Sequence, residues 1–272
     1  MRQKLGQHFL IDTNTLQKIA EGVCINAHET IIEIGPGHGE LTTRLVEIMS
    51  RTPHTHIILI EKDTTLIPHL SQQFKTYIES HMLEIRVGDA LTLIPELTET
   101  LQKRGAPYKI VGNIPYYITG FLFRVIGELA YKPTICVFMI QKEVAERVTA
   151  TPPEMNLLSA SVQLWAHTAL LYIVPKRFFS PPPQVDSAVI SLTVKSAQTE
   201  VLPEQFYECI KALFKQPRKT ILNNLKALPR FATMNKEKVD AFFTSIHHKP
   251  QDRPQDMHIE SIILLTHLLY ND

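Results

Sequence analysis

The feature that most constrains the fold is a series of short apolar runs rich in β-branched residues. These runs lie at 30–34, 56–61, 83–87, 109–112, 134–140, 169–174 and 187–194. Between the early runs are stretches with helical spacing, such as Leu41, Leu45 and Ile48 on one face. Strands that alternate with helices predict a mostly parallel sheet covered on both faces. The last two runs lack a long helix between them, which predicts an antiparallel pair at one edge.

The pattern changes after Lys195. The stretch SAQTEVLPEQ is polar and is typical of a linker. Beyond it, apolar residues recur only at helical spacing, which predicts helices at 203–215, 217–228, 236–244 and 258–270. We therefore expect two domains. Residues 1–197 would form an α/β domain with a Rossmann-like, seven-stranded sheet, and residues 198–272 a small all-helical domain.

Composition excludes several classes of protein. The formal net charge is +1, so the chain as a whole has no strong attraction to polyanions. No apolar run approaches the ~18–20 residues of a membrane span, and MRQKLGQHFL is too polar for a signal peptide. The 3 cysteines are far apart, and the 12 histidines show no metal-ligand spacing. We expect a cytoplasmic protein with no membrane partner and no bound metal.

A glycine-rich loop follows the first predicted strand, in EIGPGHGELT at 33–42. Gly35, Gly37 and Gly39 allow a tight turn and a close approach of the backbone to a ligand. The dinucleotide fingerprint needs its third glycine one residue later, where Glu40 stands. With the acidic Glu33 before it, the loop fits S-adenosylmethionine better than NAD. An ordinary tight turn is the alternative.

Two carboxylates end the next two predicted strands. Glu61 can accept hydrogen bonds from ribose hydroxyls, and Asp89 can accept one from an adenine amino group. Either residue alone could simply cap a helix. Because the carboxyl ends of parallel strands meet at one edge, these residues and the glycine loop predict a single ligand crevice.

The fourth predicted strand runs into NIPY, residues 113–116. An aromatic amine is a poor nucleophile because its lone pair is delocalised into the ring. The side-chain oxygen of Asn113 and the carbonyl of Ile114 can hold its N–H groups, so that the lone pair turns toward a methyl donor. Pro115 stiffens the turn, and Tyr116 offers a face on which a base can stack. The alternative is a structural Asn-Pro turn with a core tyrosine.

These motifs resemble those of the ribosomal RNA adenine N6,N6-dimethyltransferases, and within them the bacterial small-subunit type. The resemblance covers nearly the whole chain. It is carried by KLGQHFL at 4–10, EIGPGHGELT at 33–42, IEKD at 60–63, VGDAL at 87–91, GNIPYYIT at 112–119, QKEVAERVTA at 141–150 and FFSPPPQVDSAV at 178–189. It implies a class I methyltransferase fold in the first domain and S-adenosylmethionine as the cofactor.

The resemblance also implies site residues. The cofactor would contact His8, Leu10, Gly35, Gly37, Glu61, Lys62, Asp89, Ala90 and Asn113. Catalysis would fall to Asn113, Ile114, Pro115 and Tyr116, with Phe179 opposite Tyr116 across the target pocket. The implied activity, in ribosome biogenesis, is dimethylation of N6 of two adjacent adenosines near the 3′ end of 16S rRNA. The substrate would be an immature 30S particle, and the enzyme a monomer.

The helical region adds a basic segment without an acidic residue. Its members are Lys211, Lys215, Arg218, Lys219, Lys226 and Arg230. Such a run is often only a solvated face, but here it predicts contacts with RNA phosphates. Two other functions stay open. One is a large-subunit rRNA methyltransferase that confers antibiotic resistance, and the other is a non-enzymatic RNA-binding assembly or transcription factor.

Overall fold

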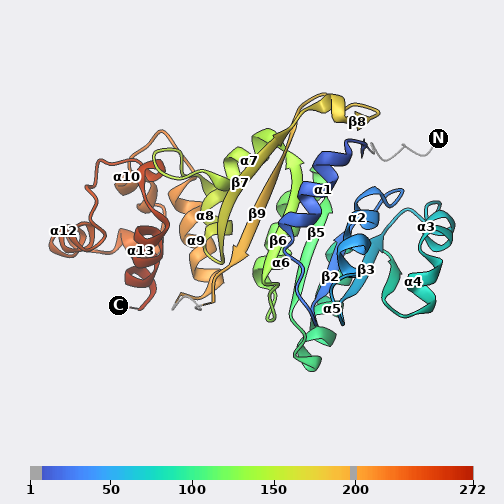
Figure 1. Ribbon diagram of the computed structural model, residues 1–272. Helices are drawn as coiled ribbons and strands as arrows, with labels where there is room; N and C mark the ends of the chain where they lie inside the picture. The colour runs from blue at the N-terminus through green and yellow to red at the C-terminus, as the bar shows by residue number, and fades with distance from the viewer. Residues whose placement is uncertain (1–7, 197–200, 272) are drawn as a thin grey trace. The chain divides into compact units, whose positions relative to one another are not determined.

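A seven-stranded sheet forms the centre of the first part of the chain (Figure 1). The computed structural model describes residues 8–196 and 201–271. The strand order is β4-β3-β2-β5-β6-β9-β7. The strands are β2 Thr30–Ile34, β3 His56–Glu61, β4 Leu83–Val87, β5 Tyr108–Asn113, β6 Ile135–Gln141, β7 Ala166–Val174 and β9 Ser187–Val194. All seven predicted runs are therefore strands, with ends that differ from the prediction by at most three residues.

The register of the sheet brings the predicted site residues to one edge. β2 pairs in parallel with β3 and β5, so that Glu33 lies opposite Leu59 and Val111. β3 pairs in parallel with β4, and β5 with β6. β9 runs antiparallel to β6 and is the neighbour of β7 at the sheet edge. The mostly parallel Rossmann-like sheet of the sequence prediction is confirmed.

Helices cover both faces of this sheet (Figure 1). α1 and α2 pack together on one face, and α5 and α6 on the other. The helices of this region are α1 Thr13–Gly22, α2 Glu40–Met49, α3 Ile67–Gln73, α4 Lys75–Glu79, α5 Ala90–Arg104, α6 Thr119–Glu128 and α7 Lys142–Thr149, with 3-10 turns η1 Tyr116–Ile118 and η2 Lys176–Phe178. Two short strands, β1 Phe9–Leu10 and β8 Phe179–Ser180, form a separate antiparallel pair.

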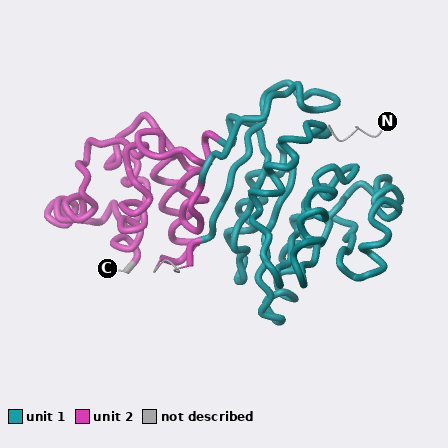
Figure 2. Tube along the Cα trace, in the orientation of Figure 1, with its two compact units in different colours: residues 1–145, 169–194 teal, residues 146–168, 195–272 magenta. Residues whose placement is uncertain are grey.

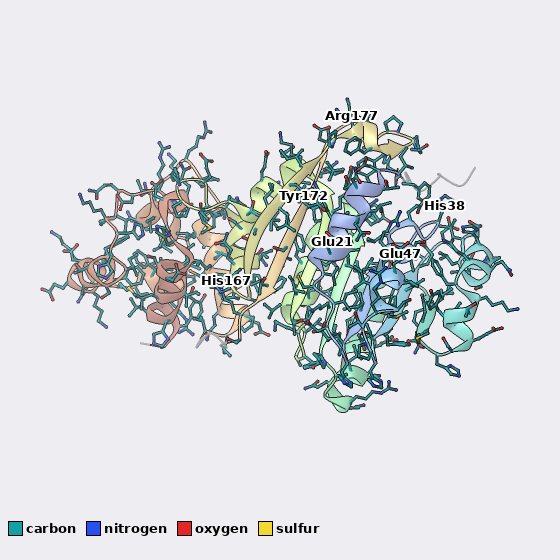
Figure 3. All side chains as sticks on the ribbon, in the orientation of Figure 1. Glu21, His38, Glu47, His167, Tyr172 and Arg177 are labelled. Atoms are coloured by element: carbon teal, nitrogen blue, oxygen red, sulfur yellow. The ribbon has the colours of Figure 1, made fainter. Side chains whose placement is uncertain are left out.

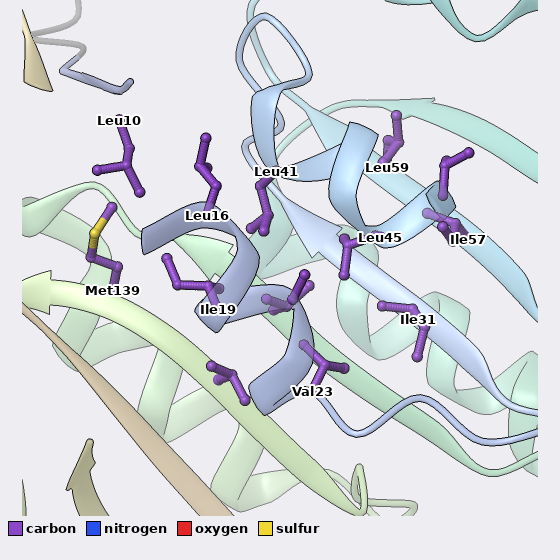
Figure 4. Close-up of a cluster of buried hydrophobic side chains, with 14 of the residues drawn as sticks. Leu10, Leu16, Ile19, Val23, Ile31, Leu41, Leu45, Ile57, Leu59 and Met139 are labelled. Atoms are coloured by element: carbon purple, nitrogen blue, oxygen red, sulfur yellow. The ribbon is translucent and has the colours of Figure 1, made fainter. Parts of the chain in front are cut away.

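The sequence analysis did not predict α1. Asp12 begins it, because its side chain accepts a hydrogen bond of 2.8 Å from the Thr15 backbone N–H. Leu16 and Ile19 then point into the core beside Leu41 of α2 (Figure 4). A buried leucine or isoleucine contributes roughly 1.5–3 kcal/mol, so this apolar layer holds α1 and α2 firmly on the sheet.

The chain divides into two compact units (Figure 2). The first comprises residues 1–145 and 169–194, and the second comprises 146–168 and 195–272. The domain boundary expected between 197 and 198 lies outside the described residues. The second unit also takes in residues 146–168, because α8, Leu157–Gln163, packs against α9 and α13 of that unit.

The remaining elements of the second unit are helical. They are α9 Pro203–Leu213, α10 Ile221–Leu225, α11 Pro229–Ala232, α12 Lys236–Ser245, η3 Pro254–Asp256 and α13 Ile259–Asn271. The prediction of one helix over 217–228 was wrong. The buried side chain of Asn224 bonds to both the N–H and the carbonyl of Gln216, at 3.1 Å each, and so holds a turn there. Thr220 then caps the short α10.

Candidate active site

A cavity of about 360 Å³ opens at the carboxyl ends of β2, β3 and β5, within the first unit. Every residue predicted for catalysis or for the cofactor lines it. These residues are His8, Leu10, Gly35, Gly37, Glu61, Lys62, Asp89, Ala90, Asn113, Ile114, Pro115, Tyr116 and Phe179. The structure thus brings together segments that are far apart in the sequence. The individual roles of these residues remain predictions.

Glu61 is held in place beneath the glycine loop. The backbone N–H of Gly37 donates to its Oε2 over 3.3 Å, and that of Asp63 donates to its Oε1 over 2.7 Å. Gly37 has φ +62°, and a Cβ there would lie 3.0 Å from the Phe9 ring, so a larger residue would strain the backbone and press on that ring. Because each carboxylate oxygen can accept more than one bond, Glu61 keeps acceptor capacity for a ligand.

The sequence left open whether Asp89 caps a helix or accepts a hydrogen bond from a ligand. Its Oδ1 accepts from the Leu91 N–H over 3.0 Å and caps α5, while its Oδ2 accepts from Lys62 Nζ over 2.8 Å. The Lys62 bond, followed by the Leu91 bond, lowers the pKa of Asp89. The structure thus shows the helix cap, on an ionised carboxylate that also lines the cavity, while acceptance from an adenine amino group stays a prediction.

Gly112 and His8 set the position of Asn113. A Cβ at Gly112 would lie 2.5 Å from the Ile34 carbonyl oxygen, so only glycine lets β5 lie this close to β2. The Asn113 Nδ2 then donates to the His8 carbonyl over 3.2 Å. Among residues 8–196 and 201–271, no hydrogen bond occupies the side-chain oxygen of Asn113, so this oxygen can act as an acceptor for a ligand.

Tyr116 and Phe179 are two of the aromatic residues that line the cavity. The Tyr116 hydroxyl lies 3.2 Å from Ser187 Oγ, which fixes the tilt of a half-buried ring. Phe179 is buried, and its strand β8 pairs with β1, which sets Leu10 opposite Phe179. His8 Nδ1 is 2.8 Å from the Pro181 carbonyl oxygen. The short β1–β8 sheet thus places residues predicted to contact the cofactor beside one predicted to contact the target base.

Sequence reasoning missed part of the cavity wall. The missed lining residues include Phe9, Leu16, Ile19, Leu41, Ile60, Tyr117 and Met139. A signal existed for α1, because Asp12 stands before apolar residues at helical spacing. β1 and β8 have two residues each and leave no periodic pattern, so their pairing could not be predicted.

Further observations concern metal binding, membrane spans and the basic residues predicted to bind RNA. Over residues 8–196 and 201–271, no cluster of His, Cys, Asp and Glu could hold a metal ion. No helix within the same ranges is long and apolar enough to span a bilayer. The six predicted RNA-binding residues lie in the second unit, and all are exposed. The Arg230 guanidinium packs over the Tyr270 ring at 4.9 Å from its centroid.

Comparison with known families decides which kind of protein this is. Residues 1–253 match the family "Ribosomal RNA adenine dimethylase". The chain belongs to the ribosomal RNA adenine dimethylase family. Its members are S-adenosylmethionine-dependent methyltransferases, so the predicted enzyme class and cofactor are confirmed.

Other members of the dimethylase family resemble the whole chain. "Ribosomal RNA small subunit methyltransferase A" of Dehalococcoides mccartyi is 33% identical over 273 residues, covering 100% of this chain and 89% of that protein. The protein of the same name from Clostridioides difficile is 34% identical, with 98% and 90% covered.

Solved structures agree on the fold. A dimethyladenosine transferase from Plasmodium falciparum superposes with a TM-score of 0.75 at 22% identity, covering 95% of this chain and 96% of that one. The 23S rRNA methyltransferase ErmE gives a TM-score of 0.74 at 22% identity, with 96% and 99% covered. At this identity the likeness extends to the fold and not to the substrate.

The cavity fits the cofactor of the dimethylase family. S-adenosylmethionine presents ribose hydroxyls and an adenine amino group, which are donors. Glu61 and Asp89 are acceptors at the ends of neighbouring strands. The apolar side chains of Leu10, Leu16 and Ile19 supply a dry wall.

Proposed function

We propose that this dimethylase transfers methyl groups from S-adenosylmethionine to N6 of two adjacent adenosines near the 3′ end of 16S rRNA. The product would be N6,N6-dimethyladenosine, made within an immature 30S particle during ribosome biogenesis. The relatives named above act, by their names, on the small subunit, which favours this substrate over the large subunit. A monomer in the cytoplasm fits such a substrate.

The observation that carries the proposal is the placement of Asn113. It ends β5 in the same cavity as Glu61 and Asp89, and its amide nitrogen is already engaged by the His8 carbonyl. Its oxygen can therefore accept an N–H of the target amine. A second acceptor is the carbonyl of Ile114, the next residue of the cavity wall.

These two acceptors would raise the reactivity of the amine. When both N–H groups are held, the nitrogen pyramidalises more easily and its lone pair points away from the ring. Bound S-adenosylmethionine supplies an activated methyl group on a sulfonium, a good leaving group. Positioning is then the main task of the chain, and no strong general base is required. The proton can leave to solvent once the amine is cationic.

Tyr116 and Phe179 are proposed to hold the target base. Both rings line the cavity, and each comes from a different segment of the first unit. Stacking on an aromatic side chain contributes ~1–3 kcal/mol per base. Pro115 restricts the backbone between Asn113 and Tyr116, so that the acceptor and the stacking ring keep a fixed relation.

We assign the cofactor to the part of the cavity that is lined by the glycine loop and by the ends of β3 and β4. We assign the ribose to Glu61, the adenine to Asp89 with Ala90, and the methionine part to the loop of Gly35 and Gly37. His8, Leu10 and Lys62 complete this set, and all of them line the cavity. Lys62 acts on the cofactor through Asp89, because it holds that carboxylate ionised and oriented.

RNA docking is assigned to the second unit, which contains the expected helical domain. The basic segment of Lys211, Lys215, Arg218, Lys219, Lys226 and Arg230 is exposed and contains no acidic residue. We propose that it binds rRNA phosphates.

Single-turnover methylation tests this function. Immature 30S and 50S particles are incubated separately with the enzyme and labelled S-adenosylmethionine. The products are then separated as mono- and dimethyladenosine. Dimethyladenosine in 30S rRNA is the expected result. Label in the 50S particle alone would favour the large-subunit activity, and cofactor binding without label in either would favour a non-enzymatic factor.

A further inference from the structure

Glu33 lines the cavity, yet the function proposed above gives it no task. It lies on β2, is 1% exposed, and accepts a hydrogen bond of 2.7 Å at Oε2 from the Thr42 hydroxyl of α2. Within the described part of the chain, no second donor bonds to this carboxyl. A buried acid with one bond, at the wall of a ligand cavity, responds strongly to any charge placed nearby.

The groups that face Glu33 give it no cation. Glu40, where α2 begins, and Glu61 of β3 are both acidic, and both oppose a negative charge on Glu33. The strand partners Leu59 and Val111 are apolar. Burial is the largest influence and, together with Glu40 and Glu61, raises the pKa of Glu33 to about 8, although the Thr42 bond lowers it.

The other neighbouring elements do not change this balance. α1 contributes Leu16 and Ile19 to the cavity, and both are apolar. His38, before α2, lies 3.7 Å from Glu40 and is exposed, so its partner is Glu40. Glu33 is therefore an uncharged acid at neutral pH until a positive ligand enters the cavity.

We propose that the sulfonium of bound S-adenosylmethionine lies beside Glu33, which releases one proton when this cofactor binds and retains it when S-adenosylhomocysteine binds. Because both ligands carry the ammonium, equal proton release with both would assign the effect to the ammonium and overturn the inference. The cofactor carries a sulfonium and an ammonium, whereas the product has a neutral thioether in place of the sulfonium. The ionised carboxyl would thus favour the charged cofactor over the product and help the product to leave. This inference rests on the proposed place of the cofactor in the cavity.

The direction of the pH dependence follows from linkage. A ligand that prefers the ionised carboxyl binds more tightly as pH rises toward about 8, and its affinity levels off above that value. Below pH 8 the affinity changes by up to about tenfold per pH unit, the limit for one linked proton. The affinity for S-adenosylhomocysteine should not change with pH through Glu33. The ligands' own amino groups titrate alike with wild type and variants, so the difference between proteins isolates Glu33.

Titration calorimetry in phosphate and in Tris measures the proton directly, because the two buffers differ in ionisation enthalpy. For wild type at pH 7, a group with pKa about 8 should release about 0.9 proton with S-adenosylmethionine, and about half a proton at pH 8. Binding of S-adenosylhomocysteine should release no proton that depends on Glu33, so wild type and Glu33→Gln should agree for this ligand. Glu33→Gln should abolish the release and reduce the preference for the cofactor over the product about tenfold.

Two further variants make the test specific. Glu47→Gln removes an exposed carboxylate on the same helix α2, and Figure 3 labels its position. Glu47 pairs with Arg44 at 3.0 Å, and its replacement should leave the proton release unchanged. Thr42→Val removes the hydrogen bond that favours the ionised form of Glu33, so the pH midpoint of proton release should move upward. This variant tests the inference independently if Glu33→Gln does not fold.

The outcomes separate this inference from the proposed function. Three further results would overturn this inference and leave the proposed function intact. In the first, wild type binds S-adenosylmethionine without releasing a proton. In the others, Glu33→Gln releases as many protons as wild type, or the pH midpoint of release is the same in Thr42→Val as in wild type. If wild type binds neither ligand, the proposed cofactor site itself is wrong.

Discussion

The cavity of the first unit and the basic segment of the second differ in how tightly the fold fixes their side chains. In the cavity, Asn113 is held by the His8 carbonyl, and Glu61 accepts bonds from two backbone N–H groups. The basic segment consists of exposed side chains, of which Arg230 packs on a ring. Chemistry needs fixed geometry, whereas attraction to phosphates needs only charge. Substitutions should therefore have large and specific effects in the cavity and small, salt-sensitive effects in the segment.

The largest effect should come from Asn113→Ala. If the side-chain oxygen holds the amine as it pyramidalises, its loss should lower the single-turnover rate about 100- to 1000-fold, comparable to the loss of one transition-state hydrogen bond. Binding of the rRNA particle should change little, because this bond strengthens in the transition state. Rapid-quench methylation of immature 30S particles measures the rate, and a filter assay measures binding.

The matched control is Asn14→Ala, an exposed residue on α1 that should leave the rate unchanged. Analysis of the product adds a second readout. After the first methyl transfer only one N–H remains, so an enzyme with a single acceptor should accumulate monomethyladenosine. A near-normal rate with Asn113→Ala would remove this residue from the mechanism.

The next largest effect should be a loss of cofactor affinity when Glu61 is replaced. Glu61→Ala should weaken the binding of S-adenosylmethionine by ~1–3 kcal/mol, the range for hydrogen bonds made by a charged group. Calorimetry with S-adenosylmethionine and NAD measures it, with the exposed Glu79→Ala of α4 as the control. Unchanged affinity for S-adenosylmethionine in Glu61→Ala would show that the ribose does not bind there.

Two substitutions of Tyr116 should separate the contribution of its aromatic ring to binding from that of its hydroxyl. Tyr116→Ala should weaken binding of the target base by ~1–3 kcal/mol through lost stacking. Tyr116→Phe keeps the ring and loses only the contact with Ser187, so it should cost about 0.5–1.5 kcal/mol or less. Fluorescence of 2-aminopurine placed at the target position reports the stacking. Equal losses in the two variants would assign the effect to the hydroxyl.

The same contrast explains what the sequence could predict. Glu61, Asp89 and Asn113 lie at the carboxyl ends of predicted strands, and parallel strands place such residues at one edge of the sheet. These three residues could therefore be predicted from the strand ends and the motif spacing, whereas His8, Leu10 and Phe179 were implied only by the family resemblance. The contact of the His8 carbonyl with Asn113 could not be predicted, because it depends on the pairing of two short strands far apart in the sequence.

The second unit was harder to predict for a related reason. The expected helix over 217–228 is interrupted because Asn224 bonds to the backbone of Gln216. In the sequence, Asn224 is a polar residue within an otherwise helical pattern, and nothing there indicates that it is buried. Local patterns identify helices, but they do not show which polar side chain will end one.

The smallest effect should come from single charges in the basic segment. Lys219→Gln removes an exposed charge from the turn before α10, and it should leave the methylation rate on saturating 30S particles unchanged. If Lys219 contacts one phosphate, the slope of log affinity against log salt should fall by about 0.7–0.9, which is about fivefold in affinity at 0.15 M salt. Lys238→Gln, exposed on α12 and outside the segment, is the matched control. Filter binding at several salt concentrations measures the slope.

A slope that is the same in wild type and Lys219→Gln would mean that this residue belongs to a solvated face. An effect confined to the rate would place Lys219 with the chemistry, and the contrast between the two regions would fail.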